Sequence, residues 1–221
     1  MRFLVCVSLV AALSSGCSFH YSLGGGPTYF GSGVKLVDTR DVRDFDEIDV
    51  LGATDVRVRV GEQTRIVVSG DDNLIDHVLT EVDGRTLEVR MENGSYNMKK
   101  PLVVTIYTPG LDALTIKGSG DAFLSGLDED ELRLSVMGSG DVEAEGMVEH
   151  LIARVKGSGD MSLKELRARH ADVSVKGSGD ITLYASESLD ASVMGSGDIS
   201  YWGNPVERSV SEMGSGDIEA H

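Results

Sequence analysis

The chain has 221 residues, with 36 acidic and 20 basic side chains and a formal net charge of −16 at pH 7. This acidic balance lacks the clustered positive charge that nucleic acids and anionic membrane surfaces require, so we expect neither as a partner. Apolar residues make up 41% of the chain and prolines number only 4, which indicates folded structure and excludes a disordered chain.

Residues 1–16 are predicted to be a signal peptide, because Arg2 precedes an apolar run that is too short to span a bilayer as a helix. The segment "LSSGC" resembles a bacterial lipoprotein signal, in which the cysteine becomes the lipidated mature N-terminus. Ser14 stands where such signals usually carry leucine, so a plain secreted protein is the alternative.

Cys17 is the predicted lipidation site, and it would be the only cysteine left after Cys6 is removed with the signal. Ser18 follows it, and by resemblance this favours the outer membrane over inner-membrane retention. Residues 17–43 contain several glycines and no sustained period, which predicts a lipidated N-terminus on a flexible tether.

Residues 44–117 are predicted to form a β-rich N-terminal part of the folded domain. Val56, Val58 and Val60 alternate with polar residues and define one buried strand face. Asp83-Gly84 between two alternating runs predicts a tight turn, and residues 102–108 predict a buried strand. We expect degenerate coils or a capping unit at this end.

Residues 118–221 contain the tetrapeptide Gly-Ser-Gly-Asp six times, at offsets of 18–20 residues. Apolar and polar residues alternate through each repeat: Val175, Gly177, Gly179 and Ile181 share one side. Such a unit cannot bury its apolar face alone, so we predict a parallel β-solenoid in which each unit is one coil. The variable middle of each unit is predicted to be a loop.

The stretch "FDEIDVLGATDVRVRVGEQTRIVVSGDDNLIDHV", followed by repeated Gly-Ser-Gly-Asp, resembles the family described as "putative auto-transporter adhesin, head GIN domain". The resemblance covers roughly residues 44–220. It implies a bacterial envelope protein with an all-β, right-handed parallel β-helix-like fold. It carries over no catalytic residue.

The repeat aspartates are predicted to stack along one outer edge of the solenoid. They are Asp121, Asp141, Asp160, Asp180, Asp198 and Asp217. One interpretation is structural, with each carboxylate accepting backbone N–H groups at the glycine corner. The other is a cation-binding edge that holds Ca²⁺ between coils.

No catalytic constellation is recognised in the sequence. His77, His150, His170 and His221 show no metal-ligand spacing, and no serine has a nucleophile context. Polysaccharide lyases do use β-helices, so an enzyme acting on extracellular polysaccharide is kept as an alternative function.

The last unit departs from the repeat. Arg208 and Glu212 replace apolar or small residues and are predicted to cap the open end. Tyr201 and Trp202 lie close to this end. They are predicted either to pack over the terminal core or to form a surface for a partner or for self-association.

The sequence therefore predicts a non-catalytic outer-membrane lipoprotein, anchored at Cys17, that carries a β-solenoid for binding a glycan or protein surface. The alternatives are the polysaccharide-acting enzyme and a purely structural periplasmic module.

Overall fold

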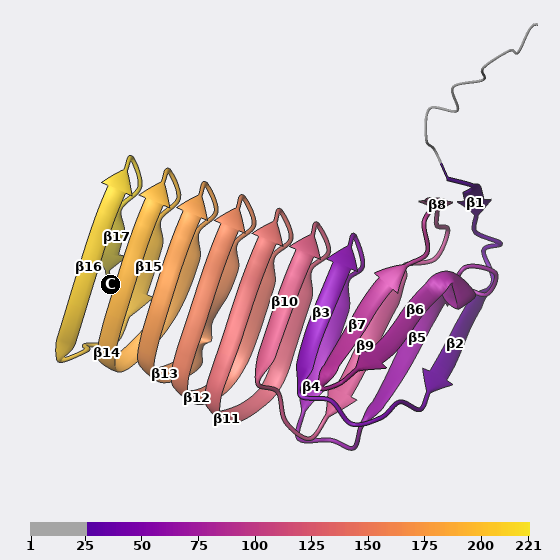
Figure 1. Cartoon of the computed structure of the whole chain (residues 1–221), viewed down its shortest axis with the longest axis horizontal. Helices are drawn as coiled ribbons and strands as arrows, with labels where there is room; N and C mark the ends of the chain where they lie inside the picture. Colours follow the sequence, from indigo (N-terminus) through magenta and orange to yellow (C-terminus); the bar gives the residue numbers. More distant parts are fainter. Residues whose placement is uncertain (1–25) are drawn as a thin grey trace, which may run out of the picture.

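The computed structural model describes residues 26–221, and the chain in this range forms a β-solenoid of about 5 turns. Figure 1 shows the coils side by side along one axis, with the repeat region at one end and the N-terminal part at the other. The predicted all-β solenoid is confirmed.

The first half of the described chain contains ten short elements. They are β1 (Thr28–Phe30), β2 (Lys35–Arg40), β3 (Glu47–Gly52), β4 (Val56–Val60), β5 (Arg65–Asp71), the 3-10 turn η1 (Ile75–His77), β6 (Val78–Asp83), β7 (Thr86–Met91), β8 (Ser95–Asn97) and β9 (Val103–Thr108). The repeat region combines four long strands of 15–17 residues with four shorter ones. They are β10 (Ala113–Gly118), β11 (Ala122–Gly138), β12 (Val142–Gly157), β13 (Met161–Gly177), β14 (Ile181–Gly195), β15 (Ile199–Trp202), β16 (Glu207–Gly214) and β17 (Ile218–Ala220).

Each long strand, β11 to β14, bends once and so contributes to two layers of the solenoid (Figure 1). In β11, residues 122–125 pair with β4 and residues 133–138 pair with β10, both in parallel. We call the surface formed by the strand ends before each Gly-Ser-Gly-Asp corner layer A, and that formed after the corner layer B. The single hydrophobic core lies between them.

The period-two alternation predicted from the sequence sets which side chains fill this core. Val175, Ile181 and Leu183 are buried, whereas Lys176 and Asp180 are exposed. The same parity continues through the tetrapeptide, because the second glycine of each corner is buried and the serine beside it is exposed. The corner is therefore a bend within an extended chain, as predicted.

Both glycines of each corner are required by the neighbouring coil. The first glycine has a φ between 134° and 149°, and the backbone of a residue with a side chain would be strained in this range. A Cβ on the second glycine would lie 1.9–2.2 Å from a carbonyl oxygen one coil away. The six tetrapeptides stack in register along one side of the solenoid, from Gly118 to Gly214.

A seventh corner, Gly52-Ala53-Thr54-Asp55, continues this stack toward the N-terminus, although the sequence reading did not recognise it. Gly118 pairs with Gly52, and the backbone N–H of Asp121 donates to Asp55 Oδ1 at 3.1 Å. Thr54 replaces the second glycine, and its buried Oγ1 has no hydrogen-bond partner. The repeat escapes detection because 66 residues separate this corner from the next.

The variable middles of the repeats were predicted to be loops, and this is wrong for four of the five. Residues 125–131, 145–150, 164–170 and 184–190 lie inside continuous strands. Register shifts between neighbouring strands absorb the length differences, for example between Leu163 and Arg167. Only the fifth segment, around residues 203–206, leaves the strand conformation.

Antiparallel strands close the N-terminal end of the solenoid. β2 and β9 each pair with β5, and β6 pairs with β7 through the predicted Asp83-Gly84 turn. Both expected features occur here: these antiparallel strands cap the end, while β3 and β4 pair in parallel with β10 and β11 as a degenerate coil would. No structural break separates residues 44–117 from the repeats, because β3 and β10 are adjacent parallel strands.

The predicted flexible tether over residues 17–43 is wrong for residues 28–40, which form β1 and β2. Asp71 anchors this segment: its carboxylate accepts backbone N–H groups of Gly33, Lys99 and Lys100 at 2.7–2.9 Å. Burial alone would raise the pKa of Asp71, but these three hydrogen bonds outweigh it and lower the pKa.

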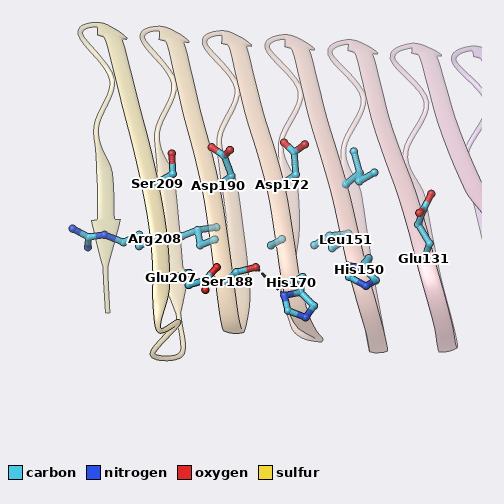
Figure 2. A pocket seen from close by; sticks show the side chains of 13 residues that line it. Glu131, His150, Leu151, His170, Asp172, Ser188, Asp190, Glu207, Arg208 and Ser209 are labelled. Atoms are coloured by element: carbon cyan, nitrogen blue, oxygen red, sulfur yellow. Dashed lines mark hydrogen bonds between the residues drawn. The ribbon is translucent and has the colours of Figure 1, made fainter.

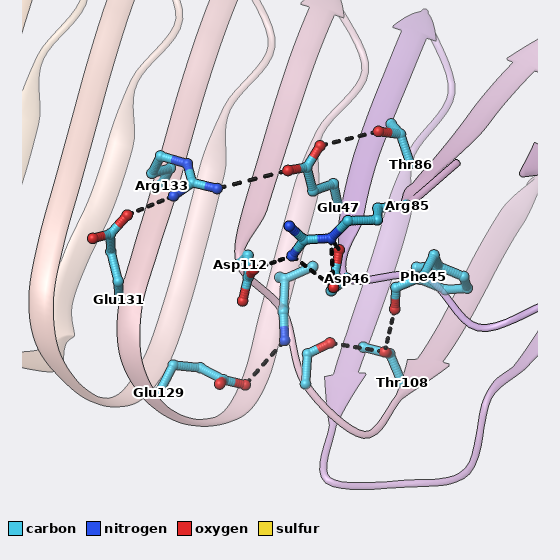
Figure 3. A network of polar contacts seen from close by, with 12 residues as sticks. Phe45, Asp46, Glu47, Arg85, Thr86, Thr108, Asp112, Glu129, Glu131 and Arg133 are labelled. Atoms are coloured by element: carbon cyan, nitrogen blue, oxygen red, sulfur yellow. Dashed lines mark hydrogen bonds and ion pairs between the residues drawn. The ribbon is translucent and has the colours of Figure 1, made fainter. Parts of the chain in front are cut away.

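Polar contacts join the capping strands to the repeat coils (Figure 3). Arg85 donates to both carboxylate oxygens of Asp46 and also contacts Asp112 across the junction. The two carboxylates raise the pKa of Arg85 and keep it charged. The half-buried Glu129 accepts the Leu111 N–H at 3.0 Å, and burial raises its pKa.

Substituting Gly159 with alanine tests the steric requirement. The new Cβ would lie 2.0 Å from the Gly140 carbonyl oxygen, and we expect a loss of about 3 kcal/mol or more in unfolding free energy. Urea unfolding measures it. Ser158→Ala at the exposed neighbouring position should change stability by less than about 0.5 kcal/mol. Equal midpoints for both variants would contradict the steric account.

Candidate functional site

The repeat aspartates form a ladder along the corner side of the solenoid. The backbone N–H of each aspartate donates to Oδ1 of the aspartate one coil earlier, at 2.8–3.1 Å. The carboxylate acceptors run from Asp55 through Asp198. The structural interpretation is thus supported, with the refinement that the hydrogen bonds connect successive coils and do not close a turn within one coil.

Lysine side chains do not neutralise the charge of the ladder among the described residues. Lys117 pairs with Asp49 at 2.7 Å and leaves Asp121 to the backbone N–H groups. Within residues 26–221, none of the ladder aspartates forms an ion pair. The partners of these carboxylates are therefore the backbone N–H groups of the next coil.

The ladder carboxylates do not converge on a common point. Among the described residues, the one group of three or more potential metal ligands whose ligand atoms lie within 4.8 Å of one another is Glu149, His150 and His170. This group lies away from the ladder, at the bend within the long strands that leads from layer B into layer A. We call this the second bend of the coils, the first being the glycine corner. Ca²⁺ binding by the ladder stays a prediction.

A shallow groove of about 570 Å³ crosses the coils beside this second bend (Figure 2). Buried Leu151, Ala171 and Leu189 lie at its floor. One row of outward side chains along it is in register from coil to coil. The row is Glu131, His150, His170, Ser188 and Glu207. We call this concave surface the histidine groove.

The histidines of this groove correct the expectation that no histidine has metal-ligand spacing. His150 and His170 pair in register on adjacent coils, and their rings stack with centroids 4.7 Å apart. The sequence separation of 20 residues equals one repeat, so the repeat period was the signal that could have found the pair.

Arg169 holds two carboxylates next to the histidines. Its guanidinium donates to Glu149 Oε1 and Oε2 at 3.0 Å and also contacts Glu187. The hydrogen bond from Arg169 lowers the pKa of Glu187, and the same carboxylates raise the pKa of Arg169. Glu187 therefore remains charged beside His170.

A second candidate surface lies on the outer side of layer B in the last coils. Trp202 stacks on His221 with ring centroids 4.7 Å apart, and Lys164 Nζ lies 4.1 Å from the Trp202 ring centroid. Arg167 Cζ lies 4.3 Å from the ring centroid of Tyr184, which pairs with Trp202 on the adjacent strand. We call these five residues the aromatic row.

Tyr201 does not lie on the predicted interaction surface. Its side chain is 3% exposed, because it shares the inward parity of Leu183, and its hydroxyl accepts a hydrogen bond from Arg208 at 2.6 Å. Trp202 has the opposite parity and faces outward, so it does not pack over the terminal core.

Arg208 and Glu212 act as predicted at the last coil. Arg208 reaches across from β16 to Tyr201, and Glu212 accepts the Ile218 N–H at 3.0 Å. These bonds join the two layers at the end of the core. Cys17 and the predicted signal peptide lie outside the described residues. Over the described part, no helix is long and apolar enough to cross a membrane.

Comparison with known protein families shows to which family the chain belongs. The profile described as "Putative auto-transporter adhesin, head GIN domain" matches residues 44–205. The chain belongs to this head GIN domain family. The match spans β3 to β15 and leaves out β1 and β2 at one end and β16 and β17 at the other. No protein of curated function matches the chain.

Solved structures agree with this family. A "putative adhesin" from Bacteroides fragilis superimposes with a TM-score of 0.74 at 28% identity, covering 87% of this chain and 100% of that one. A "putative lipid binding protein" from Parabacteroides distasonis gives a TM-score of 0.60 at 26% identity, covering 88% and 99%. A "putative adhesin" from the same species gives 0.63 at 21% identity, covering 88% and 100%, which shows the shared fold alone.

The ladder predicts different effects for two substitutions at Asp160. Asp160→Ala removes the acceptor for the Asp180 N–H and should lower the unfolding free energy by about 1 kcal/mol. Asp160→Asn keeps an oxygen acceptor and removes a charge that repels its neighbours, so its effect should be smaller. Urea unfolding compares them, and an equal loss in both variants would show that the charge itself is what matters.

Calcium separates the two interpretations of the ladder. If the carboxylates serve the backbone N–H groups, the thermal midpoint of the head GIN domain should be the same in calcium and in chelator. A calcium-dependent rise in the wild type that is reduced in Asp160→Ala would instead establish the cation-binding edge.

Proposed function

We propose that this chain is a non-catalytic, adhesin-like binding module of the cell envelope. Its family of adhesin heads supports the class of function, and it supports an exported location. The signal-like N-terminus and Cys17 support a lipid anchor in the outer membrane. The 11 residue steps from Cys17 to Thr28 can span at most about 40 Å, so the module would stay near the membrane.

The aromatic row is the surface that we propose for ligand binding, and its composition is the observation that carries the proposal. Lys164 and Arg167 place positive charge beside Tyr184 and Trp202 on a chain whose net charge is −16. Aromatic rings and cationic groups at one surface suit ligands that combine apolar faces with anionic groups.

Hydroxyl groups extend this surface. Ser162, Thr182 and Ser200 pair in register on adjacent coils, two positions before Lys164, Tyr184 and Trp202, and share their outward parity. A row of donors and acceptors beside aromatic rings matches the alternating hydroxyl and C–H faces of a sugar. We therefore propose a glycan with anionic groups as the ligand, held along the solenoid axis.

The strands make this surface rigid before the ligand arrives. Tyr184 and Trp202 lie in paired strands, and both adjacent inward residues, Leu183 and Tyr201, are buried. A surface held in this way loses little conformational entropy on binding. This supports a binding role that needs no converging catalytic groups.

A glycan array tests the proposal. We expect the wild-type chain to bind acidic glycans, and Trp202→Ala to lose at least about tenfold in affinity, because it removes the ring that contacts both Lys164 and His221. Phe30→Ala is the control, since Phe30 is an exposed aromatic residue in β1, at the other end of the chain.

Three outcomes would contradict the proposal: binding of no glycan by the wild type, equal binding by Trp202→Ala, or release of reducing sugar from a bound polysaccharide. Sedimentation of wild type and Trp202→Ala, run beside the array, separates glycan binding from self-association through the same end of the solenoid.

A further inference from the structure

The structure also contains a second, independent site. We propose that the histidine groove binds a divalent transition-metal ion, and that this ion is Zn²⁺. The ligands are His150 and His170, which line the groove, and Glu149, which lines an adjoining hollow. This site does not depend on the aromatic row, which lies on the other layer, so either proposal can fail without the other.

The donor set is the first argument. Two imidazoles and one carboxylate are the ligand types that Zn²⁺ prefers, whereas Ca²⁺ takes oxygen ligands. The candidate ligand atoms of these three residues all lie within 4.8 Å of one another. A tetrahedral Zn²⁺ with bonds of about 2.1 Å places its ligand atoms about 3.4 Å apart, so the side chains would have to close by up to about 1.4 Å.

The orientation of His170 is the second argument. Its Nδ1 lies 2.8 Å from the Ser188 hydroxyl oxygen on the next coil. Its Nε2 faces the two carboxylates, 3.9 Å from Glu149 Oε1 and 3.6 Å from Glu187 Oε2. A hydrogen bond that holds one ring nitrogen and leaves the other free is the arrangement that surrounds histidine ligands of metals.

The backbone supplies the third argument, because it fixes the two histidines relative to each other. They pair in register within long strands that continue on both sides, and the neighbouring inward residues Leu151 and Ala171 are buried. The ring planes are 15° apart. Nearly parallel, stacked rings cannot both point a nitrogen at one ion, so binding would need at least one imidazole to rotate while the strands that carry the histidines stay fixed.

The local charge is the fourth argument. Glu149 and Glu187 contribute two negative charges and Arg169 one positive charge, so the cluster attracts a divalent cation. Arg169 is also the competitor, since it must share Glu149 with the ion. With three protein ligands, a fourth position faces the groove and is open to water or to a donor atom from a binding partner.

Isothermal titration of the untagged chain with ZnCl₂, after treatment with a chelator, tests the site. We expect one Zn²⁺ per chain. His150→Asn and His170→Asn should each weaken the binding by at least about tenfold. His221→Asn is the matched control, because it removes an exposed histidine outside the groove and should leave the affinity unchanged.

Co²⁺ gives a second readout that does not depend on affinity alone. Tetrahedral coordination by imidazole nitrogen and carboxylate oxygen produces visible d–d absorption, which should appear in the wild type and in His221→Asn and be absent in His170→Asn. Thermal unfolding without metal shows whether each variant is folded. The proposal would be overturned if the wild type did not bind Zn²⁺. It would also be overturned if His150→Asn and His170→Asn bound Zn²⁺ as tightly as the wild type.

Discussion

The close approach of one coil to the next at the glycine corners is the constraint on which the rest of the structure depends. A carbonyl oxygen of each coil lies where a side chain of the next coil would begin, 2.0 Å from the Cβ that Gly179 lacks. A corner that stacks on a preceding corner therefore needs glycine at that point to bend and keep its strands paired, and Thr54 holds the equivalent place only in the first corner of the stack. The spacing of the corners then sets which residues meet, both in the core and on the surface.

The aspartate ladder follows from this stacking and would otherwise oppose it. Neighbouring carboxylates about 5 Å apart repel by about 1 kcal/mol even at the dielectric constant of water. Each coil offsets this by donating the backbone N–H of its aspartate to the carboxylate of the preceding coil, as Asp180 does to Asp160. The acidic row is thus part of the mechanism that joins coils, and the surfaces with mixed chemistry lie elsewhere, in the histidine groove and the aromatic row.

Much of the fold could be predicted because a strand obeys a strict period of two. The alternation around Val175 correctly assigned inward and outward positions, and the 18–20-residue spacing correctly indicated a solenoid. The same alignment placed Tyr201 with Leu183, so its burial was available from the sequence. The β2 strand was not, because its pairing with β5 is antiparallel and depends on a carboxylate, Asp71, that is far along the chain.

The candidate sites were harder to predict, since they arise between coils. His150 and His170 look unrelated until one repeat is recognised as one turn of the solenoid, and the register shifts in the second bend decide which side chains align there. Trp202 was recognised by its rarity, but its contacts come from Lys164 in β13 and from His221, which follows β17. A surface built across coils in this way can change its ligand without any change in the corners that support it.

Disulfide formation between coils tests the central claim most directly. With Cys6 and Cys17 replaced by serine, the pair Arg154→Cys and Ser174→Cys should cross-link on mild oxidation, because these outward residues face each other on adjacent strands. The pair Arg154→Cys and Ser192→Cys should not, because two coils separate them by about 10 Å. Cross-linking of the second pair, or failure of the first in a folded variant, would contradict the stacking of one repeat on the next.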